Sequence, residues 1–236
     1  KNWTSEMKLD YIDSDLNFSL LALDNDDIDC VVAGAVNTTS DVVRSAIRII
    51  GLKKTTKWLS SVFFMLSPNN DNFYTYSDCG VVPDPNSEQL CEIGYQASQL
   101  HSLISLNAPK VSFLSFSTLG SAEHYKVSRV QDAVKLFSSR HKDIIHDGEM
   151  QFDAAVNPEI SKIKMPNSKL SGQANVFVFP DLNSANIAYK ITNHLANYQS
   201  LGPILTGLNK PVNDLSRGCT VDDIVYISAI AAIQSN

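Results

Sequence analysis

The sequence lacks the patterns that mark several common classes of protein. Its four cysteines show no CxxC spacing, and no histidine accompanies them at metal-ligand spacing, which argues against a zinc site. No apolar run approaches the length of a membrane span, and the opening residues do not form a signal peptide. The chain does not begin with methionine, so we expect a fragment or a processed piece.

An excess of basic residues is also missing. The 236 residues carry a formal net charge of −6, which argues against a general nucleic-acid binder. An even cysteine count allows two disulfides, but the spacing and the size of the core favour reduced thiols in a cytoplasmic protein. We therefore expect no metal, no nucleic-acid partner and no membrane partner.

What the sequence does contain is an alternation of short apolar runs with helical patterns. This alternation predicts an α/β fold with a mainly parallel sheet. Strands are predicted at 30–36, 61–66, 73–82, 111–116, 144–145, 175–180 and 202–208, and helices at 41–50, 87–100, 127–140, 153–164, 185–195 and 224–233. Clusters of Gly, Ser, Thr and Asn follow several strands, where open α/β sheets bind ligands.

The segment Lys210–Asp223 is the strongest candidate for chemistry. It holds a hydroxyl, Ser216, beside a fixed cation, Arg217, just before an apolar helix. A loop that opens a helix offers free N–H groups to an anion, and arginine can clamp a phosphate with two hydrogen bonds. Asn213 adds a polar side chain nearby. Because no GxSxG elbow is present, Ser216 suits hydrogen-bond donation better than nucleophilic attack.

Asp223 has two interpretations that the spacing does not separate. It lies three residues after Thr220, so the pair can form a capping box at the start of the helix. A partly buried carboxylate at the same place can also take a proton.

Two other hydroxyl-rich loops follow predicted strands. Ser117, Thr118 and Ser121 belong to one that can cradle a phosphate, although it does not match the GxxxxGK[ST] loop and an ordinary turn is the alternative. The other holds Thr38 and Thr39, with Arg44 one turn into the helix, where it can reach back to the loop or pack along a neighbour.

Three carboxylates, Asp147, Glu149 and Asp153, suggest a catalytic cluster. The neighbouring Gly148 and Gln151 make a turn-and-cap interpretation at least as good.

Ordered motifs along nearly the whole chain resemble the phosphate acetyltransferase (phosphotransacetylase) family. KPVNDLSRGC followed by VDDIV, at 210–225, is similar to the family's C-terminal signature. Matching segments are VAGAVNTTSDVVR (32–44), SVFFML (61–66), DCGVVPDPNSEQLCEI (78–93), LSFSTLGS (114–121), DGEMQFDAA (147–155), VFVFPDLNSAN (176–186) and GPILTGLNK (202–210).

The resemblance implies reversible transfer of an acetyl group between acetyl phosphate and coenzyme A, through a ternary complex and with no bound cofactor. In the family, the aspartate matching Asp223 is the base for the thiol. The arginine matching Arg217 binds the phosphoryl and carbonyl oxygens, the serine matching Ser216 supports the developing charge, and the arginine matching Arg44 helps to bind substrate. The loop of Ser115–Ser121 is implied to lie in the same cleft.

The resemblance also implies a three-layer α/β/α architecture and a cytoplasmic homodimer with two domains around a cleft. Residues 1–51 and 206–236 are expected to form the remnant of an incomplete first domain, and residues 52–205 the second. The chain departs from the family where Asn37 replaces a histidine and Ser45 a proline, and it lacks about the first third of the pattern, including a further substrate-binding arginine.

Two alternatives to an acetyltransferase remain open. One is a non-catalytic acetyl-CoA-binding regulatory domain of a larger, malic-enzyme-like protein. The other is a phosphate acyltransferase for longer acyl chains such as butyryl.

Overall fold

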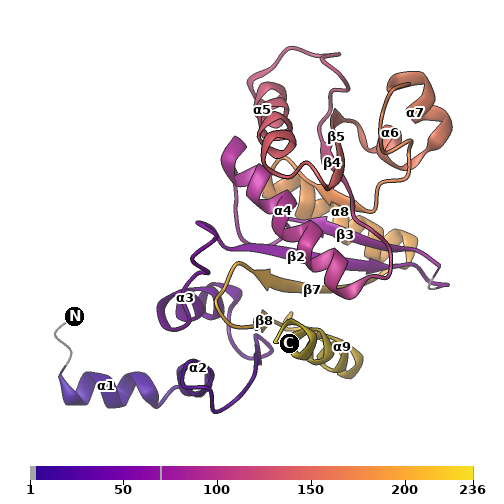
Figure 1. The fold of residues 1–236 in the computed structure, drawn as a ribbon. Helices are drawn as coiled ribbons and strands as arrows, with labels where there is room; N and C mark the ends of the chain where they lie inside the picture. The colour runs from indigo at the N-terminus through magenta and orange to yellow at the C-terminus, as the bar shows by residue number, and fades with distance from the viewer. Residues whose placement is uncertain (1–3, 70, 236) are drawn as a thin grey trace. The chain divides into compact units, whose positions relative to one another are not determined.

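A computed structural model describes residues 4–69 and 71–235. Its residues cluster into two compact units (Figure 1). Unit 1 comprises Lys1–Leu59 and Gly202–Asn236, and unit 2 comprises Ser60–Leu201. The domain limits predicted from the sequence, residues 1–51 with 206–236 and residues 52–205, stay a prediction.

Unit 2 is built on a mainly parallel sheet with strand order β5-β4-β6-β3-β2-β7. Neighbours β3–β6, β6–β4 and β4–β5 run parallel, whereas β2 and β3 form an antiparallel pair. The strands are β2 (Ser60–Leu66), β3 (Phe73–Ser77), β4 (Lys110–Leu114), β5 (Ile145–Met150), β6 (Val176–Val178) and β7 (Gln199–Thr206), the last running from unit 2 into unit 1. The predicted α/β class with a mainly parallel sheet is confirmed.

Helices cover both faces of this sheet, because alternate side chains of each strand point to opposite faces. Phe63 stacks on Tyr189 of α8 (Leu182–Ala196), with 4.2 Å between ring centroids. Its neighbour Phe64 is fully buried and stacks on Phe73, which in turn contacts His101 of α4 (Ser87–Ile104). Helix α5 (Tyr125–Arg140) packs beside α4 and against β5. Unit 2 therefore has the expected α/β/α layers.

The helix predicted at 153–164 is two helices, α6 (Phe152–Val156) and α7 (Pro158–Lys164). Asn157 divides them because its side chain accepts hydrogen bonds from the N–H groups of Glu159 and Ile160. Pro158 then occupies the first turn of α7, where its missing N–H costs nothing. The sequence signal for this break was an Asn-Pro pair.

The prediction of a turn around Gly148, at Asp147–Glu149, is wrong. These residues continue β5, in parallel register with β4, and Gly148 lies opposite Phe113. A Cβ on Gly148 would meet the carbonyl oxygen of Phe113 at 2.8 Å. The glycine therefore permits close approach of two strands and does not mark a turn.

Unit 1 contains a short parallel pair, β1 (Val31–Ala33) and β8 (Val212–Asp214). Helix α3 follows β1 and α9 follows β8, and α9 packs on both strands. The remaining helices, α1 and α2, were not predicted from the sequence. The four helices are α1 (Ser5–Ile12), α2 (Asp15–Asp24), α3 (Thr39–Ile49) and α9 (Val221–Gln234).

Three details differ from the sequence prediction in unit 1. The strand predicted at 30–36 ends at Ala33, because Gly34 turns the chain with φ +109°. Helix α3 begins earlier than predicted, with Thr38 as its N-cap. Residues Val212–Asp214, predicted as loop, are a buried strand. Among the described residues, no helix is both long and apolar enough to cross a membrane.

Replacing Gly34 by alanine tests how tightly β1 and β8 meet. A Cβ there would lie 2.2 Å from Oδ1 of Asp214 and 2.4 Å from the carbonyl oxygen of Leu215. We expect Gly34→Ala to lower the free energy of unfolding by at least about 2 kcal/mol, from overpacking and the strained φ. Gly120→Ala is the control, since φ is also positive there but no atom lies within 4 Å. Equal losses for the two variants in denaturant unfolding would contradict the close approach.

Candidate functional site

The parallel pairing of β1 and β8 brings two polar loops to one edge of unit 1. The register matches Val31 with Val212 and Ala33 with Asp214, and the N–H of Leu215 donates to the carbonyl oxygen of Ala33 at 2.6 Å. Both strands therefore end together, and the loops that leave them both open a helix. An edge where the loops after two adjacent parallel strands each open a helix favours an anionic ligand.

The first loop leads into α3. The Oγ1 of Thr38 accepts the N–H of Asp41 and donates to its Oδ2, at 3.2 and 2.6 Å. The N–H groups of Thr39 and Ser40 have no hydrogen-bond partner among the described residues and are exposed. Arg44 lies one turn on and reaches back, with Nη1 3.4 Å from Oδ1 of Asp41. This pair is exposed, so it holds Arg44 only weakly.

The second loop carries Ser216 and Arg217, and both are exposed. The Oγ of Ser216 accepts the N–H of Gly218 at 3.1 Å. Because that contact uses an oxygen lone pair, the hydroxyl hydrogen is left to donate. Arg217 makes no ion pair within the described part of the chain, so its guanidinium is available to a ligand.

Asp223 caps α9, as one of the two sequence interpretations expected. Its Oδ2 accepts the N–H of Thr220 at 2.9 Å, and its own N–H donates to the Oγ1 of Thr220 at 3.2 Å. The other oxygen, Oδ1, has no hydrogen-bond partner among the described residues, and the side chain is half-buried. One oxygen thus fixes the carboxylate while the other is free to take a proton.

Two polar residues of the Lys210–Asp223 segment are committed to the fold. The ammonium group of Lys210 donates to the carbonyl oxygens of Leu23 and Asp24, at the end of α2. Asn213 is fully buried, and its amide accepts the N–H of Leu205 and donates to Gln234. The side chain of Asn213 therefore braces β8 against β7 and α9 and does not face solvent.

Asp214 is a buried carboxyl that the sequence analysis did not single out. Its Oδ2 accepts the hydroxyl of Thr39 at 2.5 Å, and its Oδ1 has no hydrogen-bond partner in the part of the chain that the structure describes. Burial raises the pKa of Asp214, and the hydrogen bond from Thr39 opposes that shift. No local signal in the sequence marks its burial, because Val212–Asp214 has the composition of a loop and its pairing with β1 joins distant parts of the chain.

The loop of Ser117–Ser121 in unit 2 is held rigidly by its own hydrogen bonds. Oε1 of the buried Glu149 accepts the hydroxyl of Ser117 at 2.8 Å and the N–H of Gly120 at 2.7 Å. The N–H of Thr118 donates to the Oγ of Ser121, and the Oγ1 of Thr118 accepts the N–H of Gln151.

The remaining N–H groups of this loop are also used. Those of Ser117, Leu119, Ser121 and Ala122 donate to Ser115, Glu149, Thr118 and Ser117, respectively. A phosphate cradle needs free N–H donors, and this arrangement leaves none from 117 to 122.

Of the three carboxylates that suggested a catalytic cluster, each has a separate role in the fold. Glu149 supports the 117–121 loop, Asp147 accepts the N–H of Gly148, and Asp153 pairs with Lys164. The hydrogen bond from Lys164 lowers the pKa of Asp153. These contacts favour the structural interpretation.

The predicted site residues therefore fall into two groups. Unit 1 holds Thr38, Thr39, Arg44, Asn213, Ser216, Arg217 and Asp223, whereas unit 2 holds Ser117, Thr118 and Ser121. Among the first group, the β1–β8 pairing brings together the loops of Thr38–Thr39 and Ser216–Arg217.

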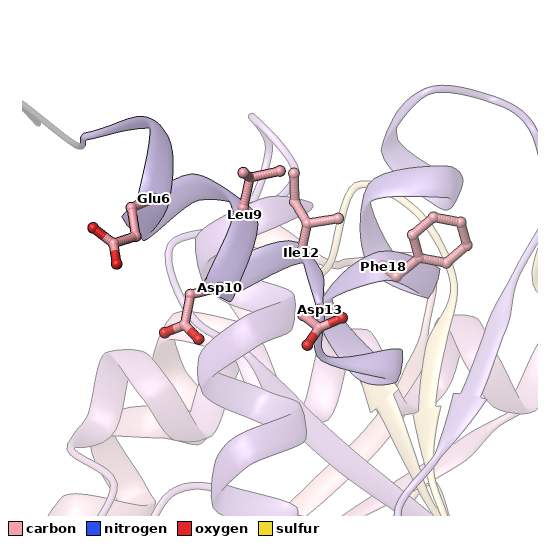
Figure 2. A pocket seen from close by; sticks show the side chains of 6 residues that line it. All are labelled: Glu6, Leu9, Asp10, Ile12, Asp13 and Phe18. Carbon is pink, nitrogen blue, oxygen red and sulfur yellow. The ribbon is translucent and has the colours of Figure 1, made fainter.

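A separate hollow lies between α1 and α2 and contains none of these residues. Leu9, Ile12 and Phe18 form its apolar part, and the labelled carboxylates in Figure 2 are those of Glu6, Asp10 and Asp13. Carboxylates repel phosphate-bearing ligands, so this hollow does not suit an acyl phosphate or coenzyme A. Among the described residues, no cluster of three or more His, Cys, Asp or Glu is arranged to hold a metal ion.

Known proteins resemble this chain in both sequence and fold. The family model described as phosphate acetyl/butaryl transferase matches residues 1–232. The chain belongs to that family. It is 41% identical to the phosphate acetyltransferase of Escherichia coli over 235 residues and 40% identical to that of Acetivibrio thermocellus over 239 residues. The alignments cover all of this chain, but 32% and 72% of those two relatives.

Solved structures agree with the family assignment. The EutD phosphotransacetylase from Staphylococcus aureus superposes with a TM-score of 0.91 at 40% identity, covering all of this chain and 72% of that one. A phosphotransacetylase from Streptococcus pyogenes gives 0.89 at 42% identity, covering 93% of this chain and 66% of that one. This family member spans about a third of the length of the Escherichia coli relative.

The role of Glu149 is tested by removing its carboxylate. Glu149→Ala leaves the hydroxyl of Ser117 and the N–H of Gly120 without an acceptor, so we expect the free energy of unfolding to fall by about 2–3 kcal/mol. Glu149→Gln keeps an acceptor and is expected to lose less than half as much in denaturant unfolding. Exposed Glu123→Ala is the control, and a loss no larger than that control would contradict the assignment.

Proposed function

We propose that the protein containing this chain transfers an acetyl group reversibly between acetyl phosphate and coenzyme A. The family assignment supports the reaction class. The observation that carries the proposal is the edge of unit 1, where Ser216 and Arg217 follow β8 beside the open N-terminus of α3. This edge supplies donors for a phosphoryl group and, at the start of α9, a carboxylate.

Asp223 acts as the base in this proposal. A free cysteine thiol has a reference pKa of about 8.5, so a thiol such as that of coenzyme A is mostly protonated at neutral pH, and a carboxylate that takes its proton assists the attack. Oδ1 of Asp223 is the oxygen available, because Oδ2 is held by the N–H of Thr220. The capping box thus positions the base and does not compete with it.

The sulfur then forms a bond to the acetyl carbon, and the bond from that carbon to the phosphate oxygen breaks. Arg217 binds phosphoryl and carbonyl oxygens bidentately, and the hydroxyl of Ser216 donates to the oxygen on which charge develops. Arg44 and the N–H groups of Thr39 and Ser40 bind the phosphoryl group from the α3 side. The products are acetyl-CoA and phosphate, and the thiol proton leaves through Asp223.

The predicted contacts of Ser117, Thr118 and Ser121 with substrate take a narrower form. Their hydroxyls and N–H groups hold the loop in shape, so we propose that these three residues fix the loop and do not themselves bind the phosphoryl group. The exposed side chains of Phe116 and Leu119 are then what the loop offers to a ligand. Asn213 and Thr38 likewise contribute by holding their loops.

The regulatory alternative differs in one measurable respect. A sensor binds acetyl-CoA without forming a thioester from acetyl phosphate and coenzyme A. Exposed Ser216 and Arg217, together with a carboxylate that keeps one oxygen free, favour catalysis. Binding of acetyl-CoA by the full protein with no thioester formation, and no arsenate-stimulated cleavage, would overturn the enzyme proposal.

The family assignment does not fix the length of the acyl group transferred, because the family description covers both acetyl and butyryl substrates. We propose acetyl, on the similarity to named phosphate acetyltransferases. Comparing kcat/KM for acetyl and butyryl phosphate tests this, with acetyl expected to be favoured at least about tenfold. A preference for butyryl phosphate would contradict it.

We also propose that the protein is a cytoplasmic homodimer with no bound cofactor. Free thiols at all four cysteines fit a reducing compartment.

Helix α8 carries an apolar stripe that supports the homodimer proposal. It exposes Ile187, Ile191 and Leu195 at intervals of four residues, so they lie on one helix face that is suited to self-association.

Asp223→Asn separates the base from the cap. Asparagine keeps an oxygen to accept the N–H of Thr220 but cannot take a proton, so we expect kcat to fall at least about 100-fold with little change in Tm. Asp222→Asn, the adjacent exposed aspartate, is the charge-matched control. Near-normal turnover by Asp223→Asn would reduce Asp223 to a cap.

A further inference from the structure

The hydrogen bond between Thr39 and Asp214 joins the two polar loops of the unit 1 edge. Asp214 is the last residue of β8, two residues before Ser216, and Thr39 is the first residue of α3. The contact is 2.5 Å between Oγ1 and Oδ2 and joins positions 175 residues apart in the chain. We propose that Asp214 is a positioning residue for the acyl-phosphate site, acting through the hydroxyl of Thr39.

The surroundings of Asp214 hold its carboxyl toward the hydroxyl of Thr39. Asp214 is fully buried, and the hydrogen bond from Thr39 to Oδ2 is the only one to its carboxyl among the described residues, since Oδ1 finds no partner there. Gly34 allows the carboxyl to lie there, because a Cβ would come within 2.2 Å of Oδ1. A buried polar group with a single partner costs stability, and a fold retains it more readily where it fixes a geometry.

The proposal rests on the proposed function, since both loops matter only if one ligand bridges them. Thr39 and Ser40 present free N–H groups at the start of α3, and Arg217 lies in the loop after β8. The Thr39–Asp214 bond sets the separation of these donors. Displacement of reacting groups by about 1 Å can cost about 100-fold in rate.

Burial and the hydrogen bond from Thr39 act on the Asp214 carboxyl in opposite directions. Burial raises the pKa of its carboxyl, and the hydrogen bond from Thr39 lowers it. Asparagine is the neutral isostere and keeps an oxygen for the hydroxyl of Thr39.

The test is a double-mutant cycle in the full protein. We expect Thr39→Val and Asp214→Ala each to lower kcat/KM for acetyl phosphate by roughly 10- to 100-fold, chiefly through KM, with KM for coenzyme A changed less than about threefold. The double variant is expected to lose no more than either single variant, because both remove the same bond. Asp214→Asn keeps the bond and is expected to restore kcat/KM to within about threefold of the wild type.

Thr39→Val keeps the test valid if Asp214→Ala does not fold, because Thr39 is exposed and valine matches its shape. Normal kcat/KM in Thr39→Val, or losses that multiply in the double variant, would overturn the positioning role. If the wild-type protein shows no acyl transfer, the proposed function fails, and calorimetric titration with inorganic phosphate replaces the kinetic readout. Absence of phosphate binding by the wild type, or equal affinity in Thr39→Val, would then overturn the inference.

Discussion

The parallel pairing of β1 with β8 is the constraint on which the candidate site depends. The three residues of β1 pair in register with the three residues of β8, which lie 181 positions later in the chain. The two strands therefore end at the same edge, and the loops that leave them there each open a helix. Val31, Val212 and Asp214 are buried at this pairing, and Gly34 lets the strands end in close contact. Without the pairing, Arg44 and Arg217 would belong to unrelated parts of the surface.

Polar residues within one short segment serve different purposes here. Lys210, Asn213 and Asp214 hold the segment to the rest of unit 1, whereas Ser216, Arg217 and one oxygen of Asp223 remain available. The same division exists in unit 2, where the hydroxyls of Ser117 and Ser121 build their own loop. Half of the six residues named in the 210–223 segment therefore support the fold, and half remain available to a ligand.

The sequence predicted what depends on local pattern. Alternating apolar and helical runs predicted the parallel α/β class, and Thr220 with Asp223 predicted the capping box. It could not predict which polar groups are already paired, because the partners are distant: Glu149 for Ser117, Asp214 for Thr39. The prediction of a turn at Gly148 is wrong, because a glycine that permits close strand contact cannot be told from a turn glycine until the neighbouring strand is known.

The central claim is that the anion site lies at the β1–β8 edge and not at the 117–121 loop. A crystal structure of the full protein with bound acetyl phosphate tests it most directly. The account predicts phosphoryl oxygens within hydrogen-bond distance of the Arg217 guanidinium and of the N–H groups of Thr39 or Ser40. A phosphoryl group held instead by the N–H groups of 117–121, with no contact to Arg217, would contradict it.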